Sequence, residues 1–169
     1  MAIAQSELLR AGQRQPLLKS QFRAGLQKTA FLCHSHRDSA LAEGLQALLA
    51  EQGVALYIDW QDASMPPEPN RVTAARLQER IKASDWFLFL ATANSMASRW
   101  CPWELGYADG QAPLDRIAIV PTSDGSTTHG NEYLQLYRRV DVSNAGELLW
   151  VPAGSYQGQL VRSIPFLRA

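Results

Sequence analysis

The chain has 169 residues, of which 46% are hydrophobic and 19% are charged. This length predicts a single domain with a core of its own, and the composition excludes disordered, collagen-like and coiled-coil proteins. Sixteen basic residues balance sixteen acidic ones, so the overall charge points to neither nucleic acid nor a membrane as a partner.

Residues 1–28 are the region with the most uneven charge. Their basic side chains are Arg10, Arg14, Lys19, Arg23 and Lys28, opposed by Glu7. A weak helical pattern runs through Leu18, Phe22 and Leu26. We interpret residues 1–28 as a basic, helical N-terminal arm that packs on the domain or mediates assembly, and residues 29–169 as the domain. A transit peptide is the alternative that an Arg-rich start leaves open.

Two apolar runs and a helical pattern follow the arm. Residues 29–33 (TAFLC) predict a buried strand, and leucines at helical spacing from Leu41 to Leu49 predict a helix that Gly53 ends. Residues 55–60 (ALYIDW) predict a second strand.

A proline-rich loop at 61–70 comes next. It holds Pro66, Pro67 and Pro69, which exclude a regular helix or strand ladder and predict a stiff, ordered excursion. A helix then resumes at Arg71, and residues 86–91 (WFLFLA) predict a third strand that is apolar on both faces.

The last part of the chain predicts a helix at 100–111 and a fourth strand at 116–121. Weaker signals predict a short helix and an edge strand within 133–142, and another strand at 147–151. The alternation of strands and helices predicts an α/β fold: a doubly wound, flavodoxin-like parallel sheet of about five strands with helices on both faces. Ligands of such sheets bind outside the carboxyl ends of the strands.

The apolar runs are far shorter than the ~18 residues that a membrane span needs, and no signal-peptide core follows the N-terminus. Cys33 and Cys101 are far apart and form no ligand-spacing pattern. Reduced thiols in a cytoplasmic protein are therefore expected.

Three histidines fall in loops at the predicted carboxyl ends. His34 and His36 have a spacing that could hold a metal with Asp59 as a third ligand, but no HExxH motif or cysteine pair supports a metal site. Ordinary loop polarity is the alternative interpretation of each histidine, including His129. The chain also lacks a G-x-S-x-G elbow, a P-loop and a G-x-G-x-x-G motif.

The segment 98–107 (SRWCPWELGY) is the most informative. Pro102 is tolerated only near the first turn of a helix, so the helix begins near Arg99–Cys101. Trp100 and Glu104 are then one turn apart on one face. The structural alternative is that Glu104 only stabilises its helix while Trp100 and Trp103 pack in the core.

Four segments, in order, carry a family resemblance. They are 31–38 (FLCHSHRD), 57–60 (YIDW) with the loop 61–70, 98–105 (SRWCPWEL) and 130–134 (GNEYL). From Phe31 to about Val140 the sequence resembles a Toll/interleukin-1 receptor (TIR) domain of the stand-alone bacterial kind. The segment 98–105 is similar to the W-x-x-x-E segment of TIR enzymes that consume NAD+, and 61–70 to the family's BB loop.

The resemblance implies that Glu104 is the catalytic glutamate. The residues that it places in the NAD+-binding cleft are His34, Ser35, His36, Asp59, Trp60 and Trp100. NAD+ is then a substrate, and no cofactor or metal is expected. Cys33 stands where the family commonly has serine, and the loop 61–70 lacks a glycine that is often found there.

The implied function is an NAD+ glycohydrolase or ADP-ribosyl cyclase that makes ADP-ribose, or a cyclic or conjugated form of it, as a signal. A role in anti-phage defence of the Thoeris type would follow, with self-association through TIR contacts and a separate effector that the product activates. The alternative is a non-catalytic TIR module that acts through self-association. A receiver-like domain is a weaker third reading, because Asp38 alone does not supply the acidic cluster that it needs.

Overall fold

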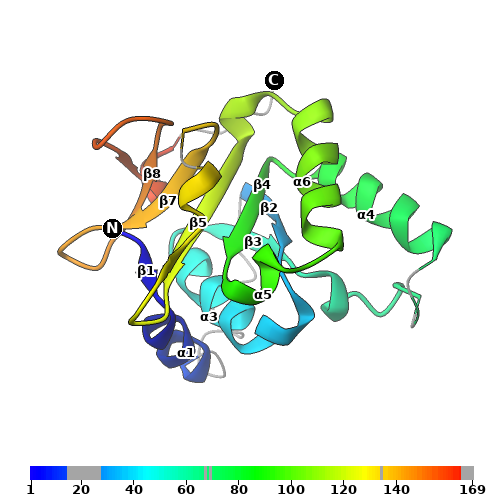
Figure 1. Cartoon of the computed structure of the whole chain (residues 1–169), viewed down its shortest axis with the longest axis horizontal. Coiled ribbons are helices and arrows are strands. Elements are labelled where there is room, and N and C mark those ends of the chain that lie inside the picture. Colours follow the sequence, from blue (N-terminus) through cyan, green and yellow to red (C-terminus); the bar gives the residue numbers. More distant parts are fainter. Residues whose placement is uncertain (15–27, 67, 69, 134, 165–169) are drawn as a thin grey trace.

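A mostly parallel sheet organises the chain in the computed structural model (Figure 1), which describes residues 1–14, 28–66, 68, 70–133 and 135–164. Its strands are β1 (Ile3–Ala4), β2 (Lys28–Cys33), β3 (Val54–Tyr57), β4 (Trp86–Ala91), β5 (Ile117–Ser123), β6 (Thr128–His129), β7 (Arg138–Val142), β8 (Leu148–Val151) and β9 (Gln159–Leu160). The α-helices are α1 (Gln5–Gln13), α3 (Ser39–Ala50), α4 (Arg71–Ala83), α5 (Ala93–Met96) and α6 (Trp100–Gln111). Short 3₁₀ turns include η1 (His36–Asp38) and η2 (Asp59–Gln61).

Five parallel strands form the centre of the sheet in the order β3-β2-β4-β5-β7. This order confirms the predicted doubly wound, flavodoxin-like α/β fold. The antiparallel strands β8 and β9 extend the sheet beyond β7. The prediction of an edge strand within 133–142 is therefore wrong, because β7 lies between β5 and β8.

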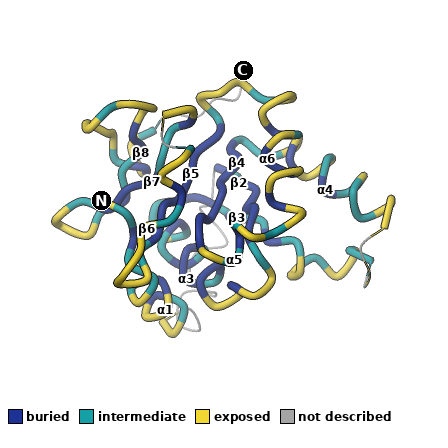
Figure 2. Tube along the Cα trace, in the orientation of Figure 1, coloured by how far each residue is buried: buried dark blue, intermediate teal, exposed yellow. Residues whose placement is uncertain are grey.

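Alternating side chains of the central strands fill two separate cores. Leu32 and Leu88 pack in a core with α1 and α3, whereas Phe31, Cys33 and Phe87 pack in a core with α4 and α6. Successive residues of a strand point to opposite faces of its sheet, so helices cover both faces, as Figure 1 shows. The strands β2, β4 and β5 are accordingly buried along almost their whole length (Figure 2).

The N-terminal segment is built into this architecture. β1 pairs in parallel with β5, where Ile3 lies opposite Thr122, and Leu8 of α1 is fully buried in the core that α3 covers. Lys28 is the first residue of β2. The pattern of Leu18, Phe22 and Leu26 lies outside the described residues.

The strand predicted at 55–60 is shorter in the structure, where β3 ends at Tyr57. Asp59 begins η2, and its carboxylate accepts a hydrogen bond from the Trp60 amide at 2.8 Å. A side chain that bonds to its own neighbouring backbone competes with strand pairing, which explains the early end. The short helix α5 was not predicted, and its start is a capping box between Thr92 and Ser95.

Asp62 anchors the start of the proline-rich loop. Its carboxylate accepts hydrogen bonds from the Tyr57 hydroxyl and from Arg80, both at 2.9 Å. The loop ends at Asn70, which caps α4 as the predicted start of that helix requires. Pro67 and Pro69 lie outside the described residues.

None of the described helices combines the length and the apolar character that crossing a membrane requires.

Candidate active site

Three loops meet at the carboxyl edge of the sheet. Because β2 pairs in parallel with β3 and β4, the chain leaves all three strands at the same edge. His34 directly follows β2, Thr92 directly follows β4, and Asp59 lies two residues beyond β3. This edge is where ligands of doubly wound sheets bind.

His34 is buried and held at both ring nitrogens. The Trp60 indole donates a hydrogen bond to His34 Nε2 at 3.2 Å, and His34 Nδ1 lies 3.3 Å from the Leu32 carbonyl oxygen. An indole N–H can only donate, so Nε2 accepts and Nδ1 carries the proton. Burial lowers the pKa of His34, which favours this neutral form.

Asp59 connects the two histidines and the tryptophan. One carboxylate oxygen accepts from the Trp60 amide at 2.8 Å, and the other lies 2.9 Å from His36 Nε2. The hydrogen bond to Asp59 raises the pKa of the exposed His36. His34 Nε2 is 3.9 Å from the same carboxylate. The structure thus brings together four of the predicted site residues.

Glu104 lies one turn into α6 and is only 6% exposed. Burial raises its pKa well above the ordinary value, the neighbouring Cys33 thiol opposes this effect, and the Asp59 charge adds to it. A buried carboxyl group with a raised pKa keeps its proton unless a positive charge is nearby. Glu104 is therefore suited to respond to a cationic ligand.

The tryptophans of α6 are not core residues. Trp100 is 39% exposed and Trp103 is 37% exposed, and their rings meet edge to face with centroids 5.5 Å apart. The alternative that both pack in the core is therefore wrong. Trp100 and Glu104 share α6, but they differ sharply in exposure.

Ser35 has a local structural contact. Its hydroxyl accepts a hydrogen bond from the Arg37 amide at 3.4 Å and caps η1. This contact orders the loop between β2 and α3, and it leaves the hydroxyl proton available to a ligand.

Asp38 is a buried residue of this edge that the sequence did not predict as a site residue. It accepts hydrogen bonds from the Thr92 hydroxyl at 2.5 Å and from the side-chain amide of Asn94 at 2.7 Å. These bonds connect η1 with the start of α5. They therefore hold the loop after β2 against the loop after β4. The sequence shows that Asp38 lies in the loop after the first predicted strand, and this position was the signal that could have indicated it. No local sequence pattern predicts that Thr92 is its partner.

The described residues contain no group of three histidine, cysteine or acidic side chains arranged to hold a metal ion. His34 illustrates the reason. Its Nε2 lone pair accepts from Trp60 and its Nδ1 proton faces Leu32, so neither ring nitrogen offers a free lone pair to a metal.

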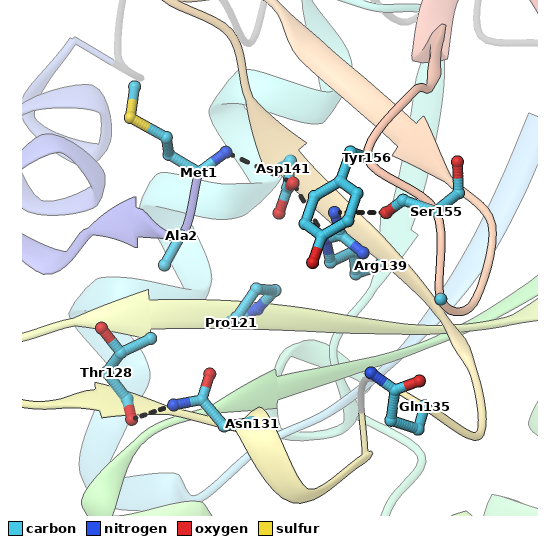
Figure 3. Close-up of a pocket in the computed structure, with 11 residues that line it drawn as sticks. Met1, Ala2, Pro121, Thr128, Asn131, Gln135, Arg139, Asp141, Ser155 and Tyr156 are labelled. Atoms are coloured by element: carbon cyan, nitrogen blue, oxygen red, sulfur yellow. Dashed lines mark hydrogen bonds and ion pairs between the residues drawn. The ribbon is translucent and has the colours of Figure 1, made fainter.

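A hollow of about 450 Å³ lies elsewhere, beside β5 and β7 (Figure 3). There Arg139 donates to Asp141 at 2.9 Å and to the Ser155 carbonyl at 2.8 Å, and the Met1 amine lies 3.3 Å from the same Asp141 oxygen. The predicted site residues do not line this hollow. Since its charged groups are already paired with one another, it is a poorer candidate for an enzyme's active site than the edge at Glu104.

A family model of the TIR domain matches residues 30–148, from β2 to the first residue of β8. The chain belongs to the TIR domain family. This confirms the resemblance found in the sequence and covers all three loops of the carboxyl edge.

Two relatives of this TIR chain carry provisional enzyme names. A protein of Bacillus cereus (strain MSX-D12), named 3' cyclic ADP-D-ribose synthase ThsB', is 34% identical over 141 residues, which are 78% of this chain and 71% of that protein. A protein of Cytobacillus dafuensis, named cyclic ADP-D-ribose synthase TIR2, is 28% identical over 81 residues, which are 46% of this chain and 21% of that protein.

Proposed function

We propose that this TIR protein cleaves the bond between nicotinamide and ribose in NAD+ and releases a cyclic ADP-ribose, with Glu104 as the catalytic residue. The observation that carries the proposal is the buried Glu104 carboxyl group at the carboxyl edge of the sheet, near Asp59 and Cys33. The names of the two relatives, both cyclic ADP-D-ribose synthases, support the same reaction.

A single carboxylate is enough for this chemistry. Most glycosidases need a second carboxyl group because the leaving oxygen must be protonated. Nicotinamide is already cationic when it is bonded to ribose, and it departs as a neutral molecule. The remaining task is to stabilise a ribose that becomes positively charged, which the negative charge of Glu104 can do in a site with little water.

The raised pKa of Glu104 fits this role. Ionising the carboxyl group in its buried position is unfavourable without a positive partner. The nicotinamide ring of NAD+ supplies that charge before cleavage, and the ribose supplies it during cleavage. Since Glu104 is only 6% exposed, the substrate reaches it only when neighbouring side chains move or another subunit reshapes the edge.

Aromatic groups near the edge suit a nucleotide. Trp60 and Trp100 are 41% and 39% exposed, so part of each side chain is open to solvent. Stacking on a ring or a cation contributes about 0.5–2 kcal/mol. We assign Trp60, Trp100, His34, Ser35, His36 and Asp59 to NAD+ binding.

Cyclisation needs an acceptor on the substrate itself. When water is kept from the ribose cation, a group of the ADP-ribose attacks in its place and closes a ring, and the proton that this group loses passes to the Glu104 carboxylate. We further propose that the product is a signal to a separate effector in anti-phage defence, and that TIR contacts between copies complete the site. The two free cysteines agree with a cytoplasmic location.

The test is to incubate concentrated protein with NAD+ and to identify the products by mass spectrometry. Glu104→Gln removes the negative charge with almost no change of shape, and we expect it to lower turnover by about 10²–10³-fold. Glu79→Gln makes the same change at an exposed position of α4 and should leave turnover unchanged.

More than about a tenth of wild-type turnover in folded Glu104→Gln would exclude Glu104 from the mechanism. A folded wild-type protein that cleaves no NAD+ at any concentration, but does self-associate, would instead be a non-catalytic TIR module.

A further inference from the structure

Asp38 occupies the position just before a helix, where an aspartate side chain ordinarily caps that helix. It precedes Ser39, the first residue of α3. An aspartate at this position usually accepts hydrogen bonds from the free N–H groups of the first turn. The Asp38 side chain makes no such bond with α3, all of which the structure describes. The helix therefore lacks a stabilising contact that its own sequence could supply.

The Asp38 carboxylate bonds instead to a segment that is 54 and 56 positions away in the sequence. One oxygen accepts from the Thr92 hydroxyl at 2.5 Å, and the other accepts from the side-chain amide of Asn94 at 2.7 Å. Asp38 is only 6% exposed, and bonds to a carboxylate at such distances are strong ones. Places where a local rule is broken in favour of a distant contact are typical of functional sites.

Thr92 is itself fixed at the start of α5. Its hydroxyl accepts from the backbone amide of Ser95 at 3.0 Å, and its own backbone amide donates to the Ser95 hydroxyl at 2.8 Å. Thr92 and Ser95 are both buried. The loop after β4 is therefore an ordered support, and Asp38 holds the loop after β2 against it.

Asp38 lies in the same 3₁₀ turn as His36, which we assign to NAD+ binding. The turn η1 contains only His36–Asp38, so a change in the direction of Asp38 also turns His36. His36 Nε2 lies 2.9 Å from the Asp59 carboxylate, and this pair connects the loops after β2 and β3. Through Asp38, the loop after β4 is connected to the same pair.

We propose that Asp38 is a positioning residue for NAD+ binding, which uses its bonds to Thr92 and Asn94 to keep His36 in contact with Asp59. This inference rests on the proposed NAD+ cleavage. Because Asp38 is buried, it acts through His36 and Asp59 rather than on the substrate itself.

Asn94→Ala is the most selective variant. Among the described residues, the Asn94 side chain bonds only to Asp38, so the variant removes that bond and leaves the cap of α5 intact. Asn144→Ala makes the same change at an exposed position between β7 and β8 and is the matched control. Thr92→Ser keeps the hydroxyl that bonds to Asp38, whereas Thr92→Val removes it.

We expect KM for NAD+ to rise about fivefold in Asn94→Ala and Thr92→Val, with kcat changed by less than about twofold. A substitution that only destabilises the fold lowers the amount of active protein, and so lowers the apparent kcat without changing KM. Asn144→Ala and Thr92→Ser should keep the wild-type KM. An unchanged KM in Asn94→Ala would overturn the proposal, and this variant still decides if Thr92→Val does not fold.

The protonation of His36 gives a second measurement, which does not need NAD+. The hydrogen bond with Asp59 raises the pKa of His36, so loss of this contact should lower the pKa toward about 6.5. NMR of the imidazole ring against pH measures the pKa in the wild type, Asn94→Ala and Asn144→Ala. We expect a lower value in Asn94→Ala alone, and the same pKa in all three proteins would overturn the proposal.

The two proposals fail in different ways. If the His36 pKa falls in Asn94→Ala but the wild-type protein cleaves no NAD+, the proposed function is wrong and the connection from Asn94 to His36 remains. If NAD+ is cleaved but neither KM nor the His36 pKa responds, the assignment of Asp38 is wrong and the function remains.

Discussion

The Trp60 indole donates a hydrogen bond to Nε2 of His34 at 3.2 Å, which joins the turn after β3 to the end of β2. His34 is only 7% exposed, whereas Trp60 is 41% exposed. The bond thus fixes the tautomer of a buried residue by means of a side chain that also faces solvent. A ligand that moves Trp60 would free the acceptor nitrogen of His34.

Trp60→Phe tests this relationship. It keeps an aromatic ring but leaves His34 Nε2 without its donor, so we expect a loss of about 1 kcal/mol in the free energy of unfolding. KM for NAD+ should rise while kcat changes little, because the proposed role of Trp60 is binding. Chemical denaturation and steady-state kinetics measure the two effects, and an unchanged KM would remove Trp60 from the binding site.

Glu104→Gln should stabilise the protein at neutral pH. Burial raises the folded-state pKa of Glu104 above its unfolded value of about 4.3. The wild-type stability is therefore complete below that value and falls as pH rises through the folded-state pKa, whereas glutamine carries no charge at any pH.

The thermal midpoints of the two proteins should coincide near pH 4 and separate at higher pH. The variant should gain about 3 °C for each pH unit by which the pKa is raised. Differential scanning calorimetry across this range checks the sign. A wild-type protein that is the more stable of the two at pH 7.5 would contradict a raised pKa.

Gly44 is required where α1 crosses α3. A Cβ at this position would lie 1.9 Å from the Leu8 carbonyl oxygen, so Gly44→Ala forces α1 away from α3. We expect a loss of about 3 kcal/mol, which outweighs the ~1 kcal/mol that alanine gains over glycine in a helix. Gly12→Ala is the matched control, since its Cβ would meet its nearest neighbour at 3.4 Å.

Gly12→Ala should therefore leave the midpoint of urea unfolding unchanged or raise it slightly. Equal midpoints for Gly44→Ala and the wild type would show that α1 is not held closely against α3.

The loop 61–70 should couple assembly to activity. Its start is fixed by the bonds from Tyr57 and Arg80 to Asp62, and proline lowers the entropy that a loop loses when it docks. Replacing Pro66 and Pro67 by glycine should leave the thermal midpoint nearly unchanged. The variant should need a higher protein concentration for the same turnover of NAD+.

Turnover against protein concentration is the measurement, with sedimentation velocity as an independent record of assembly. Superimposable curves for the two proteins would show that the loop does not control assembly.

Local patterns in the sequence determined the elements that depend on nearby residues. The apolar run 86–91 and the helix 100–111 coincide with β4 and α6, because a continuous apolar run and a proline near a helix start are local features of the sequence. The order of these elements also predicted the parallel sheet and hence the edge where the loops meet.

Only the tertiary structure decided which distant side chains meet at that edge. Cys33 and Cys101 are 68 positions apart, and His34 and Trp60 are 26 apart. Their contacts depend on strand register and on how α6 packs against β2, which no local pattern encodes. The same packing buries Glu104 and exposes Trp100, although both belong to one helix face in the sequence, because burial is set by what covers a helix rather than by its periodicity alone.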